Sequence, residues 1–137
     1  MAFTLVELLI VIVILGVMAA VVVPKFQDAS LRGRESSLRA NLILIRVAIE
    51  RSIADTDLMP QDLADLAATT EPGLGVDTDN NKVPFGAGDW RGPYLDSIPQ
   101  DPVSNSAWYY EVSTKLRYTV RSDAPGNGLN GIPYVNW

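Results

Sequence analysis

The side chains that most often carry catalysis or bind metals are missing from this chain, because its 137 residues include neither cysteine nor histidine. A thiolate nucleophile, a histidine base, a disulfide framework and a zinc site of the usual ligands are therefore excluded. Carboxylate chemistry remains open. The acidic and amide side chains whose position suggests a function are Glu7, Asp77, Asp79, Asn81, Asp96, Asp101, Asp123 and Asn127.

Glu7 is the only charged residue in the apolar run from Phe3 to Pro24. At about 1.5 Å per residue, a helix over this run is long enough to span the ~30 Å hydrocarbon core of a bilayer. A lone carboxylate costs roughly 2.5–3.5 kcal/mol at the bilayer centre, so it needs a partner or a route to the surface. Two explanations stay open: the glutamate reaches to the membrane interface, or it pairs with a cation in a bundle of such helices.

The segment Asp77–Asn81 begins like a calcium-binding loop. Lys82 stands where an EF-hand loop needs glycine, however, and Gly88 stands where it needs the last glutamate. Asp and Asn are also the residues that form turns. Turn formation is therefore the favoured interpretation, with Ca²⁺ as the alternative and no other cofactor expected.

Charge is unevenly distributed along the chain. Residues 25–54 hold six basic and three acidic side chains, whereas residues 55–137 hold twelve acidic and five basic ones. In a protein that associates with itself, such asymmetry favours contacts between subunits, while two solvated surfaces are the alternative. The basic residues lack interleaved aromatic residues, so no nucleic-acid partner is expected.

One long helix over about residues 3–54 is the element that must position Glu7. After Pro24 the helical period continues, because apolar residues recur at helical spacing. Proline removes a backbone hydrogen bond and glycine is a weak helix former, so Pro24 and Gly16 predict a break in this helix near Pro24. The residues of the apolar stripe are Leu31, Leu38, Leu42, Ile45, Ile49 and Ile53.

The remaining chain predicts short elements separated by turns. A short helix is expected at residues 61–68, followed by a long loop over residues 69–105 that aromatic and proline contacts hold in place. Alternating residues predict a β-hairpin from residues 107–112 and 116–120. The Gly- and Asn-rich tail, residues 122–137, ends either as a short strand or as packed anchors.

Phe3–Glu7, followed by Gly16 and Pro24, resembles the N-terminal signature of type IV pilins and type II secretion pseudopilins. The segment from Arg91 to Pro102, which contains Gly-Pro-Tyr-Leu, and the ending Asn136-Trp137 resemble the major pseudopilins of type II secretion systems.

The resemblance implies an α+β chain of the pilin lollipop kind. Residues 1–24 would be the hydrophobic helix half that serves as membrane anchor and filament core, residues 25–55 the amphipathic half that packs on the head, and residues 56–137 a head with a loop and a small antiparallel β-sheet. It also implies that a prepilin peptidase cuts between Ala2 and Phe3 and methylates the new amino group of Phe3. Ala2 stands where the family has glycine, and a chain that begins at Met1 is the alternative.

The resemblance assigns roles to the residues of the apolar run. Glu7 would pair with the positively charged N-terminus of an adjacent subunit and so fix the axial register, while Gly16 and Pro24 would mark a stretch that melts on assembly. In major pseudopilins an acidic C-terminal loop holds a calcium ion. The corresponding loop here keeps one aspartate, Asp123, together with Asn127.

The implied function is that of a structural subunit of a type IV pilus-like helical filament for adhesion or motility, with no catalysis. The subunit would rest in the inner membrane and then enter an extracellular pilus. Its partners would be other copies, the prepilin peptidase, and an assembly platform driven by a separate ATPase. A major pseudopilin of a short periplasmic type II secretion piston is the alternative.

A membrane-anchored periplasmic enzyme or ligand-binding domain is the interpretation from a different class. Asp96 and Asp101 would then supply the acids, and Trp90, Trp108 and Tyr110 would line a sugar site. Carboxylates beside turn prolines are more often caps and turn formers, so this interpretation is the least favoured.

Overall fold

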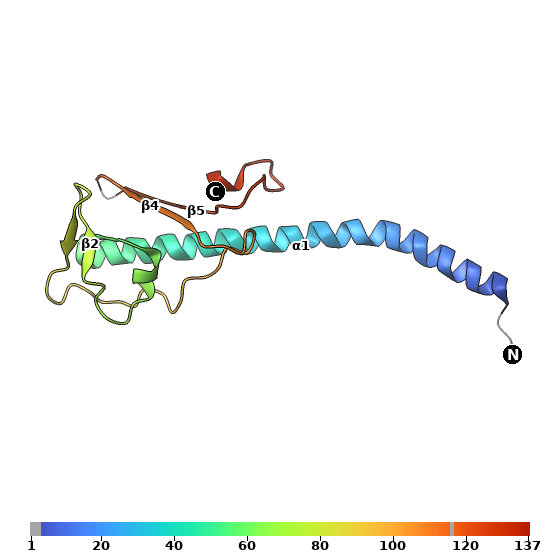
Figure 1. Ribbon diagram of the computed structural model, residues 1–137, viewed down its shortest axis with the longest axis horizontal. Coiled ribbons are helices and arrows are strands. Elements are labelled where there is room, and N and C mark those ends of the chain that lie inside the picture. Colours follow the sequence, from blue (N-terminus) through green and yellow to red (C-terminus); the bar gives the residue numbers. More distant parts are fainter. Residues whose placement is uncertain (1–3, 116) are drawn as a thin grey trace. The chain divides into compact units, whose positions relative to one another are not determined.

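The computed structural model describes residues 4–115 and 117–137 of the chain. It forms two compact units, Met1–Arg34 and Glu35–Trp137, which we call the N-terminal unit and the head. The helix α1, Leu5–Thr56, contributes to both units (Figure 1). The predicted long helix is therefore confirmed. The functional division at residues 24 and 55 stays a prediction, because compactness alone does not test it.

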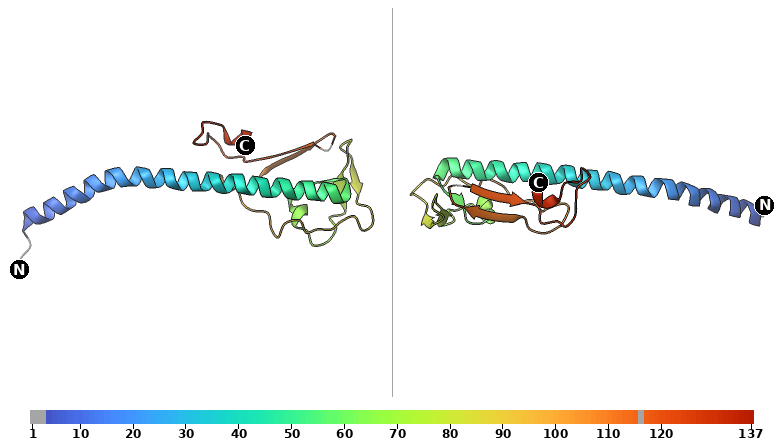
Figure 2. Two further views of the ribbon diagram at one scale, coloured as in Figure 1. Left: turned by 180° about the vertical axis from the view of Figure 1, so that it is seen from behind. Right: turned by 90° about the horizontal axis from the view of Figure 1, so that it is seen from above.

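Helix α1 continues through Gly16 and Pro24 without a break, which differs from the expectation. A proline in a helix removes one backbone donor, and the helix can absorb that loss by bending. Figure 2 shows the blue part of α1, within the N-terminal unit, curving gently while it stays helical. Melting of this stretch concerns the assembled filament and stays a prediction.

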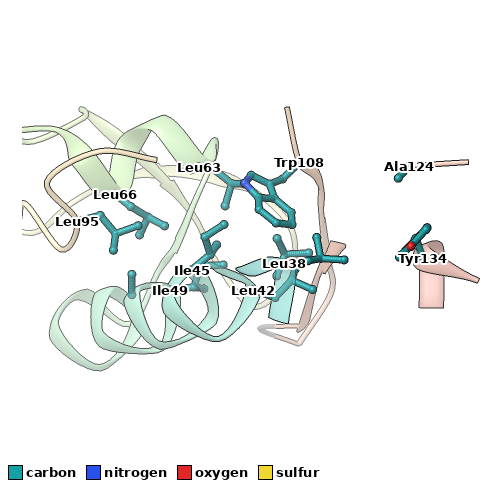
Figure 3. Packing of buried hydrophobic residues seen from close by; sticks show 12 residues of the cluster. Leu38, Leu42, Ile45, Ile49, Leu63, Leu66, Leu95, Trp108, Ala124 and Tyr134 are labelled. Carbon is teal, nitrogen blue, oxygen red and sulfur yellow. The ribbon is translucent and has the colours of Figure 1, made fainter. Parts of the chain in front are cut away.

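The head is built around the apolar stripe of α1. Figure 3 shows these helix side chains pointing toward leucines of the 3₁₀ helix η1, Leu63–Ala67, and of the following loop. Burying one such side chain contributes about 1.5–3 kcal/mol, so this contact holds the head to the helix. The main residues of this core are Leu38, Leu42, Ile45, Ile49, Leu63, Leu66, Leu95 and Trp108.

Two small antiparallel sheets complete the head. The strands β4, Tyr109–Ser113, and β5, Arg117–Arg121, form the predicted hairpin, which is confirmed. A three-stranded sheet has the order β1–β2–β3, with β1 at Met59–Pro60, β2 at Leu74–Val76 and β3 at Lys82–Pro84. The head is thus α+β, as predicted.

The second sheet corrects the sequence interpretation of residues 69–105, which were expected to form one long loop. Strands β2 and β3 lie inside this range and have three residues each. Alternation of apolar and polar residues needs about four residues to be recognised, so these strands leave no periodic signal. The predicted helix at residues 61–68 is present as η1, which starts at an Asp62–Asp65 capping box.

The tail ends as packed anchors, which decides between the two alternatives. Tyr134–Asn136 form the 3₁₀ helix η2, and Asn127 and Pro133 form an isolated β-bridge. Tyr134 is buried, and its ring lies 5.3 Å from that of Trp137.

Candidate assembly interface

The N-terminal unit exposes apolar side chains on every side of α1. The large hydrophobic side chains from Leu5 to Phe26 are 45% to 79% exposed. By length and composition, α1 can cross a membrane. A helix that is apolar all round is stable only when lipid or other helices cover it. This surface is therefore the candidate site through which the chain meets a membrane or other helices.

Glu7 and Thr4 form a capping box at the start of α1. Glu7 Oε2 accepts hydrogen bonds from the backbone N–H of Thr4 at 2.8 Å and from its hydroxyl at 2.8 Å. In return the backbone N–H of Glu7 donates to Thr4 Oγ1 at 3.3 Å. The sequence signal for this role, threonine followed three residues later by glutamate, is present in the chain but was not used in the prediction.

The capping box leaves part of Glu7 available. Among the described residues, Glu7 Oε1 accepts no hydrogen bond, and an ionised carboxylate has about four acceptor positions. A role in subunit register is compatible with this geometry and stays a prediction. The predicted processing residues Ala2 and Phe3 lie outside the described residues.

Asp77 uses its carboxylate to close the turn between β2 and β3. Oδ1 accepts hydrogen bonds from the backbone N–H groups of Asp79 at 2.9 Å and Asn81 at 2.8 Å, and Oδ2 accepts one from the Asn81 amide at 3.3 Å. The hydrogen bond from the backbone of Asn81 is the main cause of a lowered pKa of Asp77. This geometry supports the turn interpretation. Calcium binding at Asp77, Asp79 and Asn81 stays a prediction.

The second calcium candidate is the C-terminal loop. Asp123 is exposed and forms an ion pair with Arg121 at 3.6 Å, while Asn127 pairs with Pro133. Within the part of the chain that the structure describes, no three Asp or Glu side chains are grouped so that they could hold a metal ion. Calcium here also stays a prediction, and a different carboxylate holds this loop in place.

That carboxylate is Glu35 of α1, which is only 5% exposed. Its Oε1 accepts hydrogen bonds from the backbone N–H of Leu129 at 2.6 Å and from the Tyr134 hydroxyl at 3.0 Å. Burial, together with this hydrogen bond to Glu35, raises the pKa of Tyr134. The sequence interpretation assigned no role to Glu35. Its position three residues before the buried Leu38 was the available signal.

Asp101, one of the two acids proposed for an enzymatic site, forms hydrogen bonds within the head. Asp101 is fully buried and accepts hydrogen bonds from the Ser122 hydroxyl and from the backbone N–H groups of Val103 and Ser104. Burial acts to raise the pKa of Asp101, but these hydrogen bonds outweigh it, so the pKa lies below its usual value. Asp96 is exposed.

The three aromatic residues proposed for a sugar site also contact the fold. Trp108 Nε1 donates to the carbonyl of Pro99 at 2.6 Å, and the Tyr110 hydroxyl donates to the carbonyl of Pro60 at 2.8 Å. Trp90 packs with Phe85 and Tyr94 in a separate aromatic cluster. Trp108 and Tyr110 line one open depression, and Trp90 does not line it. The three aromatic residues predicted to line a sugar site therefore do not line one common depression.

Relatives from type II secretion systems match almost the whole chain. The type II secretion system core protein G of Klebsiella pneumoniae is 31% identical over 135 residues, which cover 98% of this chain and 88% of the relative. The protein of the same name from Pseudomonas aeruginosa is 28% identical, over 98% of this chain and 93% of the relative. No protein-family model and no solved structure matches the chain.

A type IV pilus protein matches a shorter part. The type IV major fimbrial protein FimA of Dichelobacter nodosus is 38% identical over 53 residues, which are 39% of this chain and 34% of the relative. The long helix, the antiparallel head and these relatives agree with one another. The chain therefore belongs to the pilin and pseudopilin family that includes type II secretion system core protein G.

Proposed function

We propose that the chain is a structural subunit of a helical filament and polymerises through the N-terminal part of α1. The observation that carries this proposal is the helix surface from Leu5 to Phe26, which is apolar on every side and exposed. Bundling such helices removes this surface from water without requiring specific pockets. The same chain also folds a separate head with its own core.

Before assembly the same helix rests in the inner membrane, where lipid covers it. Removal of Met1 and Ala2 by a prepilin peptidase, with methylation of Phe3, prepares the amino group for Glu7 of a neighbour. An inner-membrane platform with a separate ATPase then supplies the work of extraction. This role requires no catalytic step from the chain, and the buried acids Glu35 and Asp101 accept hydrogen bonds that hold loops in place.

The filament is either an extended surface pilus or a short periplasmic pseudopilus. The relatives that cover nearly the whole chain are named for type II secretion, whereas the fimbrial relative covers 39% of it. Because of this difference in coverage, we keep the pseudopilus as a second candidate function beside the pilus. Electron microscopy of sheared cell-surface material separates them, because long fibres built of this chain exclude an obligate short pseudopilus.

The role of Glu7 can be separated from its capping role by a matched pair of variants. Glu7→Ala removes the carboxylate with both hydrogen bonds that it accepts, whereas Thr4→Ala removes the two capping hydrogen bonds of the threonine hydroxyl and keeps the carboxylate with its backbone hydrogen bond. If Glu7 sets the register, Glu7→Ala abolishes filaments while the head still folds, and Thr4→Ala still assembles. Equal loss of filaments in both variants would show that helix capping is what assembly needs.

A further inference from the structure

The head carries an acidic region at the end of α1. Residues 55–89, which we call the acidic end, contain eight acidic residues and one basic residue, Lys82. Within the described residues, five of these acids are exposed and lack an ion-pair partner. Leu74 is the large hydrophobic residue exposed beside them, at 39%. The five exposed acids are Asp57, Asp62, Glu71, Asp79 and Asp89.

A groove of the opposite charge lies between α1 and the C-terminal tail. This arginine groove holds about 380 Å³ and is lined by Arg39 and Arg46 together with Ile43, Ile132 and Trp137. Ile43 is 60% exposed and Ile132 is 46% exposed, so its apolar part is open to solvent.

Both arginines of the groove keep donors free. The Arg39 guanidinium lies 4.4 Å above the ring of Trp137, and Arg46 Nη2 donates to the carbonyls of Val120 and Trp137. Neither forms an ion pair with an Asp or Glu side chain among the described residues. Since a guanidinium has five N–H donors and binds carboxylates in a bidentate manner, the groove can bind an acidic segment that also carries an apolar side chain.

The two surfaces are separated within one head, so they cannot meet in the same molecule. Arg39 and Asp55 lie on one helix, sixteen residues and thus about 24 Å apart. Figure 1 shows β2 at the green end of α1 and the red C-terminal tail beside its cyan part. Complementary surfaces at two places on one molecule give a heterologous contact, which propagates into an open helical polymer when its rotation does not close a ring.

We propose that the arginine groove of one subunit binds the segment 71–74 of a second copy, with Glu71 meeting Arg39 and Leu74 meeting Ile43. This segment combines an exposed acid with the exposed hydrophobic residue of the acidic end. The contact rests on the proposed function, because it joins the heads of subunits whose helices are already bundled. Its charge pairs select the neighbour and fix its orientation.

Disulfide cross-linking tests the contact directly, because the natural chain contains no cysteine. Full-length chains that carry both Ile43→Cys and Leu74→Cys are expected to give a ladder of cross-linked multimers in oxidised filaments. Mixed chains with one change each are expected to stop at dimers. Leu44→Cys with Leu74→Cys is the matched control, since Leu44 is exposed but does not line the groove. An equal ladder from the control pair, no ladder from Ile43 and Leu74, or a cross-link to another protein overturns the proposal.

Charge reversal gives an independent readout. Arg39→Glu and Glu71→Arg are each expected to lower filament yield at least tenfold, and the two changes together are expected to restore it. Arg51→Glu reverses an exposed arginine of α1 outside the groove and is expected to leave the yield unchanged. Normal filaments from Arg39→Glu would refute the groove contact and leave the filament function intact. A wild-type chain that forms no filaments would refute the proposed function, and this contact with it.

Discussion

Removal of the Glu35 carboxylate is expected to release the C-terminal tail from α1. In Glu35→Ala, the N–H of Leu129 and the hydroxyl of Tyr134 lose their acceptor. An unsatisfied buried donor costs about 1–3 kcal/mol, so the two together lower the free energy of unfolding of the head by about 2–6 kcal/mol. For a unit of about a hundred residues, even the lower of these values corresponds to a fall in Tm of roughly 8–16 °C.

Milder variants divide this effect into its parts. Glu35→Gln keeps an acceptor oxygen but loses the charge, so we expect a loss of about 1 kcal/mol. Tyr134→Phe removes one donor and is expected to cost about as much. Because both changes act on one hydrogen bond, their effects are expected to couple by about 1 kcal/mol in a double-mutant cycle. Thermal and urea unfolding of the full chain in detergent micelles, followed by near-UV circular dichroism, supplies these values.

Two further measurements make the result specific. Amide hydrogen exchange at Leu129 is expected to accelerate in Glu35→Ala, because that N–H is the donor at 2.6 Å. Glu50→Ala is the matched control, since Glu50 is exposed and accepts a single hydrogen bond from Tyr118 at 2.8 Å. Its cost is expected to stay below about 1 kcal/mol. Additive effects of Glu35→Gln and Tyr134→Phe within about 0.5 kcal/mol would refute the shared hydrogen bond.

Three other predictions concern acid stability, calcium and Pro24. The pKa of Asp101 lies below the usual value of about 3.9, so ionised Asp101 stabilises the head above that pH and the contribution is lost as pH falls through the lower folded-state pKa. The urea midpoint of the wild-type head is therefore expected to fall between about pH 6 and pH 2, and Asp101→Asn is expected to remove the share of this fall that Asp101 causes. Asp77→Ala is expected to lower the Tm equally with and without added Ca²⁺, because the carboxylate serves the turn; a Ca²⁺-dependent rise in Tm that only the wild-type chain shows would demonstrate a metal site instead. Pro24→Ala is expected to raise helicity and to slow filament growth if the stretch melts on assembly; unchanged growth would exclude melting as a required step.

Helix α1 and the β4–β5 hairpin could be predicted because their signals are long and periodic. The apolar stripe from Leu38 to Ile53 repeats over several turns, and the hairpin strands alternate over five residues each. Strands β1, β2 and β3 have two or three residues and owe their pairing to the rest of the head. The role of Glu35 depends on residues more than ninety positions away, so no local pattern could reveal its partners.

In the proposed function, the capping box would let one glutamate serve both in the membrane and in the filament. A bare carboxylate in hydrocarbon would have to find all its hydrogen bonds elsewhere, but two donors of Thr4 already satisfy Glu7 Oε2. Partial satisfaction lowers the cost of keeping the charge in the membrane before assembly. It does not neutralise the charge, however, and the capping hydrogen bonds hold the carboxylate at the start of α1. If Glu7 sets the subunit register as proposed, the box would hold its carboxylate ready for the amine of a neighbour shifted along the filament axis.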